Sequence, residues 1–167
     1  MKIAILGDTH RNKYGISLAL KKIKELEANM VIHLGDCVDD IEIIKTGFNG
    51  EVLGVVGNCD CTSRFPNNQI IDINGKKIFF THGDLYGVKN SLSSILYKGE
   101  EVRADIILFG HTHISLLEEI NDIILMNPGS IPKPSPWSRS GAVGFIEVSN
   151  DGEIIRKELY NIPLKLD

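Results

Sequence analysis

Long apolar runs are missing from this sequence, and none approaches the roughly 20 residues that a membrane-spanning helix needs. We therefore expect no membrane span. A basic excess is missing too, because 18 lysines and arginines face 22 acidic residues and leave a net charge of −4. That balance argues against binding to nucleic-acid polymers. Residues 1–7 contain no apolar signal core, which indicates a cytoplasmic protein.

Cysteine is scarce, with three residues at positions 37, 59 and 61. An odd count does not form a disulfide framework, and it favours a reducing compartment. Cys59 and Cys61 lack the second pair of ligands that a structural zinc site needs. We therefore expect Cys37 and Cys61 to be small buried apolar residues.

The length and composition predict one domain that covers residues 1–167. A chain of 167 residues, 43% of them apolar, can bury one good core but is too short for two ordinary domains. One proline-rich segment, 128–141, contains four of the six prolines, together with Trp137 and Arg139. A substrate wall, a subunit contact and a plain surface loop are the alternatives for this segment.

Apolar runs predict strands at residues 2–6, 30–34, 52–56 and 105–109, with helices at 16–26, 38–44 and 88–96. The last helix would be capped from Asn90 or Ser91. This alternation favours parallel pairing. A hairpin at 70–73 and 77–81 and further strands at 114–120, 123–127, 142–148 and 153–160 add antiparallel pairs. The expected fold is α/β, with two mixed sheets packed as a sandwich and helices outside.

Four of the apolar runs end in glycine followed by a side chain that can bind metal. These pairs are Gly7-Asp8, Gly35-Asp36, Gly57-Asn58 and Gly110-His111. Glycine lets the backbone turn sharply, so the next side chain is presented at the carboxyl end of the strand. Open α/β sheets bind their ligands at this edge. The pattern therefore predicts a metal site.

Further candidate ligands lie beside these pairs. In Asp8-Thr9-His10 and His111-Thr112-His113 the two flanking side chains would point the same way if the backbone is extended. His82 follows another predicted strand. His33 lies inside a strand, and we expect it to be structural. The candidate ligands are Asp8, His10, Asp36, Asn58, His82, His111 and His113.

Seven ligands are too many for one tetrahedral ion and suit two ions. Imidazole, carboxylate and amide groups suit Mn, Fe, Ni, Co or Zn better than Ca. Two divalent ions less two carboxylates leave a local charge of about +2, which attracts a phosphate ester. The sequence thus predicts metal-assisted hydrolysis of a phosphoester.

These motifs, in this order, resemble the signature of the calcineurin-like metallophosphoesterases over nearly the whole chain. The small size is similar to that of the family's compact prokaryotic phosphodiesterase branch. The resemblance implies a four-layer fold and a hydroxide between two ions as the nucleophile. It further implies that Asp8, His10 and His113 hold the first ion. Asn58, His82 and His111 would hold the second, and Asp36 would bridge both.

One position departs from the family pattern. Many relatives have histidine after Gly-Asn, where it assists the leaving group or binds phosphate, and this chain has Cys59. A thiol is a weak proton donor, and the resemblance implies phosphodiester rather than monoester substrates. Asn58 and Cys59 would act at the substrate, and Asp60 would orient its neighbours. Mn or Ni is the favoured metal.

Two rival interpretations stay open at this point. The same fold is used by a eukaryotic retromer subunit, so a non-catalytic protein-interaction scaffold is the main alternative. A purely structural metal site is the other. The expected partner is a small phosphoester, without membrane or nucleic-acid polymer, and assembly into a homo-oligomer stays open.

Overall fold

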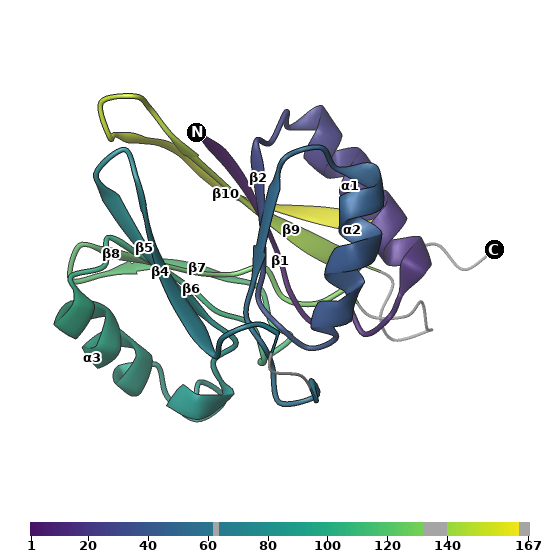
Figure 1. The fold of residues 1–167 in the computed structure, drawn as a ribbon. Helices are drawn as coiled ribbons and strands as arrows, with labels where there is room; N and C mark the ends of the chain where they lie inside the picture. Colours follow the sequence, from purple (N-terminus) through teal and green to yellow (C-terminus); the bar gives the residue numbers. More distant parts are fainter. Residues whose placement is uncertain (62–63, 132–139, 164–167) are drawn as a thin grey trace.

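The computed structural model describes residues 1–61, 64–131 and 140–163. Two five-stranded sheets carry helices on their outer faces (Figure 1). The first has the order β10-β9-β1-β2-β3 and the second β4-β5-β6-β8-β7. The strands of the first sheet are β1 (Lys2–Leu6), β2 (Met30–His33), β3 (Glu51–Gly54), β9 (Ser140–Val148) and β10 (Ile154–Pro163). Those of the second are β4 (Asn68–Ile73), β5 (Lys76–Thr81), β6 (Ile106–Leu108), β7 (Leu116–Ile120) and β8 (Ile123–Asn127).

The α-helices are α1 (Lys13–Glu25), α2 (Ile41–Gly47) and α3 (Ser93–Val102), and the short 3₁₀ helices are η1 (Val38–Asp40) and η2 (Asp84–Tyr86). Helices α1 and α2 lie outside the first sheet, and α3 lies outside the second (Figure 1). In the described ranges, no helix is long and apolar enough to cross a membrane.

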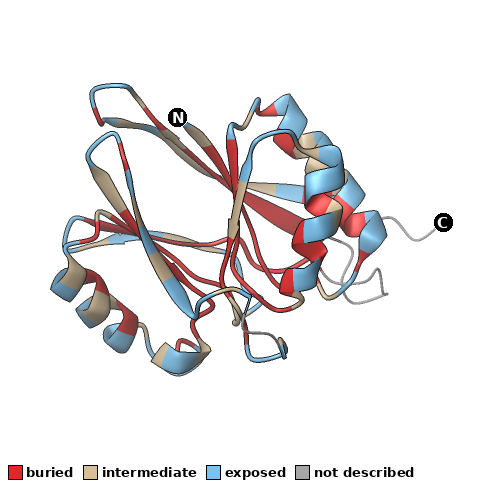
Figure 2. Cartoon of the chain, viewed as in Figure 1, coloured by how far each residue is buried: buried red, intermediate tan, exposed pale blue. Residues whose placement is uncertain are grey.

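Side-chain alternation along the strands builds the layers. In β1, Ile3 and Ile5 join the core between the two sheets, whereas Ala4 and Leu6 pack against α1. In β5, Phe79 faces α3 and its neighbours face the other sheet. Figure 2 shows the buried strand centres as red segments. Each fully buried Ile, Leu or Phe stabilises the fold by roughly 1.5–3 kcal/mol. The predicted α/β sandwich is confirmed.

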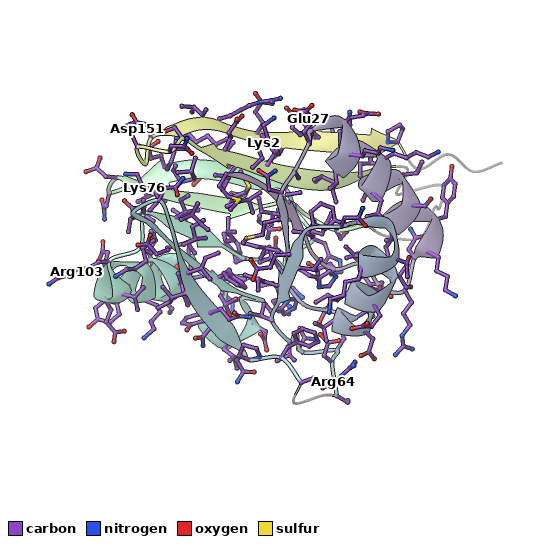
Figure 3. The ribbon with its side chains drawn as sticks, turned by 45° about the horizontal axis from the view of Figure 1, so that its top comes forward. Lys2, Glu27, Arg64, Lys76, Arg103 and Asp151 are labelled. Atoms are coloured by element: carbon purple, nitrogen blue, oxygen red, sulfur yellow. The ribbon has the colours of Figure 1, made fainter. Side chains whose placement is uncertain are left out.

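Parallel pairing gathers the strand ends, as the alternation of elements predicts. Strand β2 pairs in parallel with β1 and β3, and β6 pairs in parallel with β5 and β8. Lys2 and Lys76, at the starts of β1 and β5, lie toward the top of Figure 3. Arg64, beyond the Gly57-Asn58 loop, lies at the bottom. The carboxyl ends of the parallel strands in both sheets therefore meet at the lower rim.

Two predicted boundaries are wrong. The third helix begins at Ser93 rather than Val88. Its N-cap residue, Leu92, makes no side-chain capping bond, but Oγ of Ser91, one of the two expected capping residues, accepts from Ser93 N at 3.1 Å. Gly87 has φ +61°, a left-handed turn that interrupts the helix before it starts. The predicted second helix is also divided, into η1 and α2, and Cys37 ahead of η1 is left-handed at φ +72°.

Candidate metal centre

The first group of predicted ligands converges where β1, β2 and β6 end. One ligand atom from each of Asp8, His10, Asp36 and His113 lies within 4.8 Å of the others. Nε2 of His113 is 3.0 Å from Asp8 Oδ1 and 3.2 Å from His10 Nε2. These four side chains come from positions as far apart as 8 and 113, so the tertiary fold alone brings them together.

A second group lies around His82. Its Nε2 atom is 3.1 Å from Asn58 Oδ1 and 3.1 Å from His111 Nδ1. The same nitrogen is 3.4 Å from Asp36 Oδ1. Asp36 therefore belongs to both groups, and the structure brings together all seven side chains that the sequence singles out.

The local backbone differs from the extended conformation that we expected. Asp8, His10, Asp36, His111 and His113 have φ between +47° and +67°. This left-handed conformation costs roughly 1–3 kcal/mol per non-glycine residue and concentrates at functional sites. The two Asp/His-Thr-His stretches thus present their ligands from tight turns. Their side chains converge, but not through strand alternation.

Two of the motif glycines have a different role from the sharp backbone turn that we expected. At Gly57 and Gly110 the glycine gives room rather than an unusual φ. A Cβ at Gly57 would overlap the Asp36 carboxylate, and one at Gly110 would lie 2.8 Å from Asp8 Oδ2. Of the four glycines in the motif, Gly35 does adopt a left-handed φ, of +91°. The backbone must pass close to both carboxylates, and only glycine permits that approach.

Two hydrogen bonds orient the ligands. Nδ1 of the fully buried His82 lies 2.8 Å from the Leu34 carbonyl, which accepts only from a protonated nitrogen. This bond leaves Nε2 facing the cluster and free to bind a metal ion, as metal-binding histidines require. The backbone N–H of His111 donates to Asp8 Oδ2 at 3.1 Å.

The other oxygen of Asp8 indicates a cation. Oδ1 is buried and accepts no hydrogen bond, although it lies 3.0 Å from His113 Nε2. A buried carboxylate oxygen that accepts no hydrogen bond is costly. A divalent ion among these nitrogens and oxygens would satisfy it, and the mixed donor set suits a transition-metal ion. The residues therefore fit the metal that the sequence predicts.

Asp60 ties two ligand-bearing loops together. Oδ1 accepts hydrogen bonds from the backbone N–H groups of Cys37 and Val38, both at 2.9 Å. Oδ2 accepts from Gly57 N at 2.8 Å. One carboxylate thus links the turn after Asp36 to the turn before Asn58.

The Cys59 side chain is exposed beside this centre. Its backbone N–H donates to Asp36 Oδ1 at 3.0 Å, and its Sγ accepts from Asn58 Nδ2 at 3.4 Å. A hydrogen bond to the Asp36 carboxylate raises the pKa of the Cys59 thiol to about 11. Cys59 is therefore a neutral thiol at physiological pH.

The expectation that Cys37 and Cys61 are buried is wrong. Cys61 is exposed and Cys37 is only half-buried. Both lie in turns that follow strands rather than within strands, so no sheet face covers them.

A buried hydrogen-bonded chain supports the Asp8–His10 turn from below. Gly35 N donates to His33 Nδ1 at 3.3 Å, and His33 Nε2 lies 3.0 Å from Thr9 Oγ1. The Thr9 hydroxyl donates to Asp40 Oδ2 at 2.7 Å. The same oxygen accepts from Arg11 N at 2.9 Å. Burial lowers the pKa of His33 to about 4. His33 thus lies outside the cluster and stays neutral, in agreement with a structural role.

Sequence reasoning missed two supporting residues. Asp40 anchors the network just described. Asn127, buried at the end of β8, donates to the Gly110 carbonyl at 2.9 Å and to Thr112 Oγ1 at 3.0 Å. A polar residue that ends an apolar run and precedes Pro128-Gly129 carries the same strand-end signal as the ligands. Trp137 and Arg139, the suggested substrate wall or subunit contact, lie outside the described residues.

Comparison with known proteins points to one family. The model of the calcineurin-like phosphoesterase superfamily domain matches residues 1–151. The probable metallophosphoesterase YsnB of Bacillus subtilis is 31% identical over 156 residues, which cover 93% of this chain and 89% of its own. The phosphodiesterase MJ0936 of Methanocaldococcus jannaschii is 32% identical over 146 residues, which cover 77% of this chain and 83% of its own.

A solved structure shares the fold at low identity. Vps29 from Entamoeba histolytica, complexed with zinc, superposes with a TM-score of 0.75 at 20% identity and covers 99% of this chain and 100% of that chain. The family match extends through all the strand-end motifs. This chain belongs to the calcineurin-like phosphoesterase superfamily.

Proposed function

We propose that this protein is a dinuclear metal phosphoesterase that prefers phosphodiesters. One observation carries the proposal: two groups of ligand atoms share Asp36. The buried Asp8 oxygen that accepts no hydrogen bond supports it. A single structural ion would need four of these side chains, not seven.

Each side chain has a role in this proposal. Asp8, His10 and His113 would hold one ion, Asn58, His82 and His111 the other, and Asp36 both. When bound, the ions supply an activated hydroxide and the positive charge that an in-line displacement at phosphorus needs. The bond between His82 and the Leu34 carbonyl keeps the ring in the ligating tautomer. Asp60 holds the Asp36 and Asn58 turns at a constant separation.

Cys59 supports the preference for diesters. A thiol with a pKa of about 11 is a poor proton source for a departing alkoxide. It would also contribute no positive charge toward the second negative charge of a monoester. The relative MJ0936 of Methanocaldococcus jannaschii is a phosphodiesterase, which points the same way. Mn or Ni as metal, the cytoplasm as compartment and a single domain over 1–167 stay part of this proposal.

The direct test is an assay of purified protein loaded with Mn or Ni. We expect hydrolysis of bis(p-nitrophenyl) phosphate to exceed that of p-nitrophenyl phosphate, and a chelator should abolish both. Elemental analysis should show two metal ions per chain. Failure to hydrolyse either ester at full metal occupancy would reject the enzymatic function.

The alternative is a non-catalytic scaffold. Its support is the shared fold with Vps29. That likeness does not favour it over catalysis, because every predicted ligand is present in this chain and converges. A metal-loaded protein without esterase activity would make the scaffold the better interpretation.

A further inference from the structure

A cavity of about 220 Å³ lies beside the candidate metal centre, on the flank that α3 covers. Val88, Lys89 and Leu92, from the segment that leads into α3, form one wall. Phe109, Thr112 and Ile114 contribute the other. Thr112 stands between His111 and His113 in the sequence, and Ile114 follows His113 directly. The cavity therefore borders the loop that carries two of the predicted ligands.

The polar side chain in this wall, Thr112, already has hydrogen-bond partners within the protein. Thr112 Oγ1 accepts from Ile114 N at 3.1 Å and from Asn127 Nδ2 at 3.0 Å, and it donates to the Ile114 carbonyl at 3.3 Å. Its one donor and two acceptor positions are thus satisfied. Of the described residues that line the cavity, Lys89 alone is charged. The site suits an apolar group attached to an anion.

Exposed apolar surface borders the same cavity. Ile114, which lines the cavity, is 70% exposed although it directly follows His113. Buried Val88 and Phe109 form the base. An apolar ligand would cover Ile114, and the gain grows with the area removed from water. A cavity of about 150 Å³ already accepts benzene, so an aromatic ring fits the available volume.

We propose that this cavity binds one organic substituent of the phosphoester, preferably a planar aromatic group, and that Lys89 lies close to the phosphoryl charge. The inference rests on the proposed function, because the neighbouring metal centre would hold the phosphate. It identifies the substrate class as diesters with one bulky apolar or aromatic substituent, which would be the group that stays on phosphorus.

Two diesters with the same leaving group test the proposal. Phenyl p-nitrophenyl phosphate should be hydrolysed with a kcat/KM about tenfold above that of methyl p-nitrophenyl phosphate, the lower end of what an apolar pocket supplies. Ile114→Ser should remove most of this ratio. Ile155→Ser is the matched control, because Ile155 is 61% exposed in β10, at the far end of the other sheet. It should leave the ratio unchanged.

Binding of non-hydrolysable ligands separates this proposal from the proposed function. Calorimetry on Mn-loaded protein should show that phenylphosphonate binds about tenfold more tightly than methylphosphonate, and that Ile114→Ser abolishes the difference. Lys89→Gln should lower the affinity for both phosphonates by the same factor. A preference for phenylphosphonate without turnover would sustain the cavity and reject catalysis.

Turnover with equal kcat/KM for the two diesters, together with equal phosphonate affinities, would overturn the cavity and leave the enzyme intact. An equal loss of affinity for phenylphosphonate and methylphosphonate in Ile114→Ser would overturn the proposed cavity as well, because that result indicates a merely structural effect.

Discussion

Nε2 of His10 lies 3.2 Å from Nε2 of His113, although 103 positions separate the two residues. The rings meet edge to face, with centroids 5.0 Å apart. Asp8 Oδ1, which accepts no hydrogen bond, lies 3.0 Å from the same His113 nitrogen. Three lone-pair-bearing atoms thus converge, and without a cation at most one proton can be shared between the two rings.

Metal binding should therefore stabilise the fold. Manganese at a hundred times its dissociation constant should raise the free energy of unfolding by about 2.7 kcal/mol per site. Urea unfolding with manganese, and with a chelator instead, measures the difference. His113→Ala should lose a large part of the gain. A free energy of unfolding that manganese leaves unchanged would contradict a metal site here.

Asp36→Asn should weaken the binding of both ions. Asp36 Oδ1 lies near His82, and Asp36 also belongs to the group of Asp8, His10 and His113. Activity should fall by about 100-fold or more, the upper end of losses around metal sites. Steady-state kinetics and metal analysis measure the two effects. Asp122→Asn, in the exposed turn between β7 and β8, is the control and should behave as wild type. A variant with two ions and full activity would refute the shared role.

Asp60→Asn should separate the two loops that Asp60 joins. The amide keeps one acceptor oxygen, so at least one of three backbone N–H groups loses its partner. We expect a loss of about 1–3 kcal/mol in the free energy of unfolding, together with weaker metal binding. Asp72→Asn is the comparison, because Asp72 accepts a single backbone hydrogen bond, from Gly75 N, in an exposed turn. Equal losses in both variants would argue against a special role for Asp60.

Cys59→His should raise monoesterase activity relative to diesterase activity. The thiol, with its pKa raised to about 11 by the bond to Asp36, is neutral, whereas imidazole can carry a positive charge near neutral pH. The ratio of kcat/KM for p-nitrophenyl phosphate to that for bis(p-nitrophenyl) phosphate measures the change. Cys61→His, at an exposed cysteine two positions away, is the control. An unchanged ratio would show that the thiol does not set the preference.

Acid should destabilise the protein through His33. Its pKa is about 4 in the folded state and 6.5 in the unfolded chain, so the unfolded state takes up the proton first. The stabilisation is complete above pH 6.5 and is lost as the pH falls toward 4, by about 3 kcal/mol. His33→Gln cannot titrate. The stability of wild type minus that of the variant, measured without metal, should therefore decline across this range. A difference independent of pH would contradict the prediction.

Part of the fold follows from local patterns. The continuous apolar runs in β1 and β5 predict strands that are buried on both faces, because successive side chains must face opposite ways. Asn121 and Asp122, with φ of +52° and +62°, form the tight turn that their composition predicts. The start of α3 was missed because Val88 is apolar for another reason. It packs beside Gly83 and Phe109 in the core under η2 and α3, in a turn rather than a helix.

The features of the site also divide into those that follow from the sequence and those that depend on the tertiary structure. The amino-acid sequence by itself determined which side chains stand at the strand ends, since an apolar run that closes with Gly and Asp, Asn or His is a local pattern. Only the tertiary structure decided the 3.2 Å approach of His10 to His113, the tautomer that the Leu34 carbonyl imposes on His82, and the low pKa of His33. Each of these depends on atoms from other strands and on exclusion of water. Such quantities arise when distant segments pack, and no local pattern encodes them.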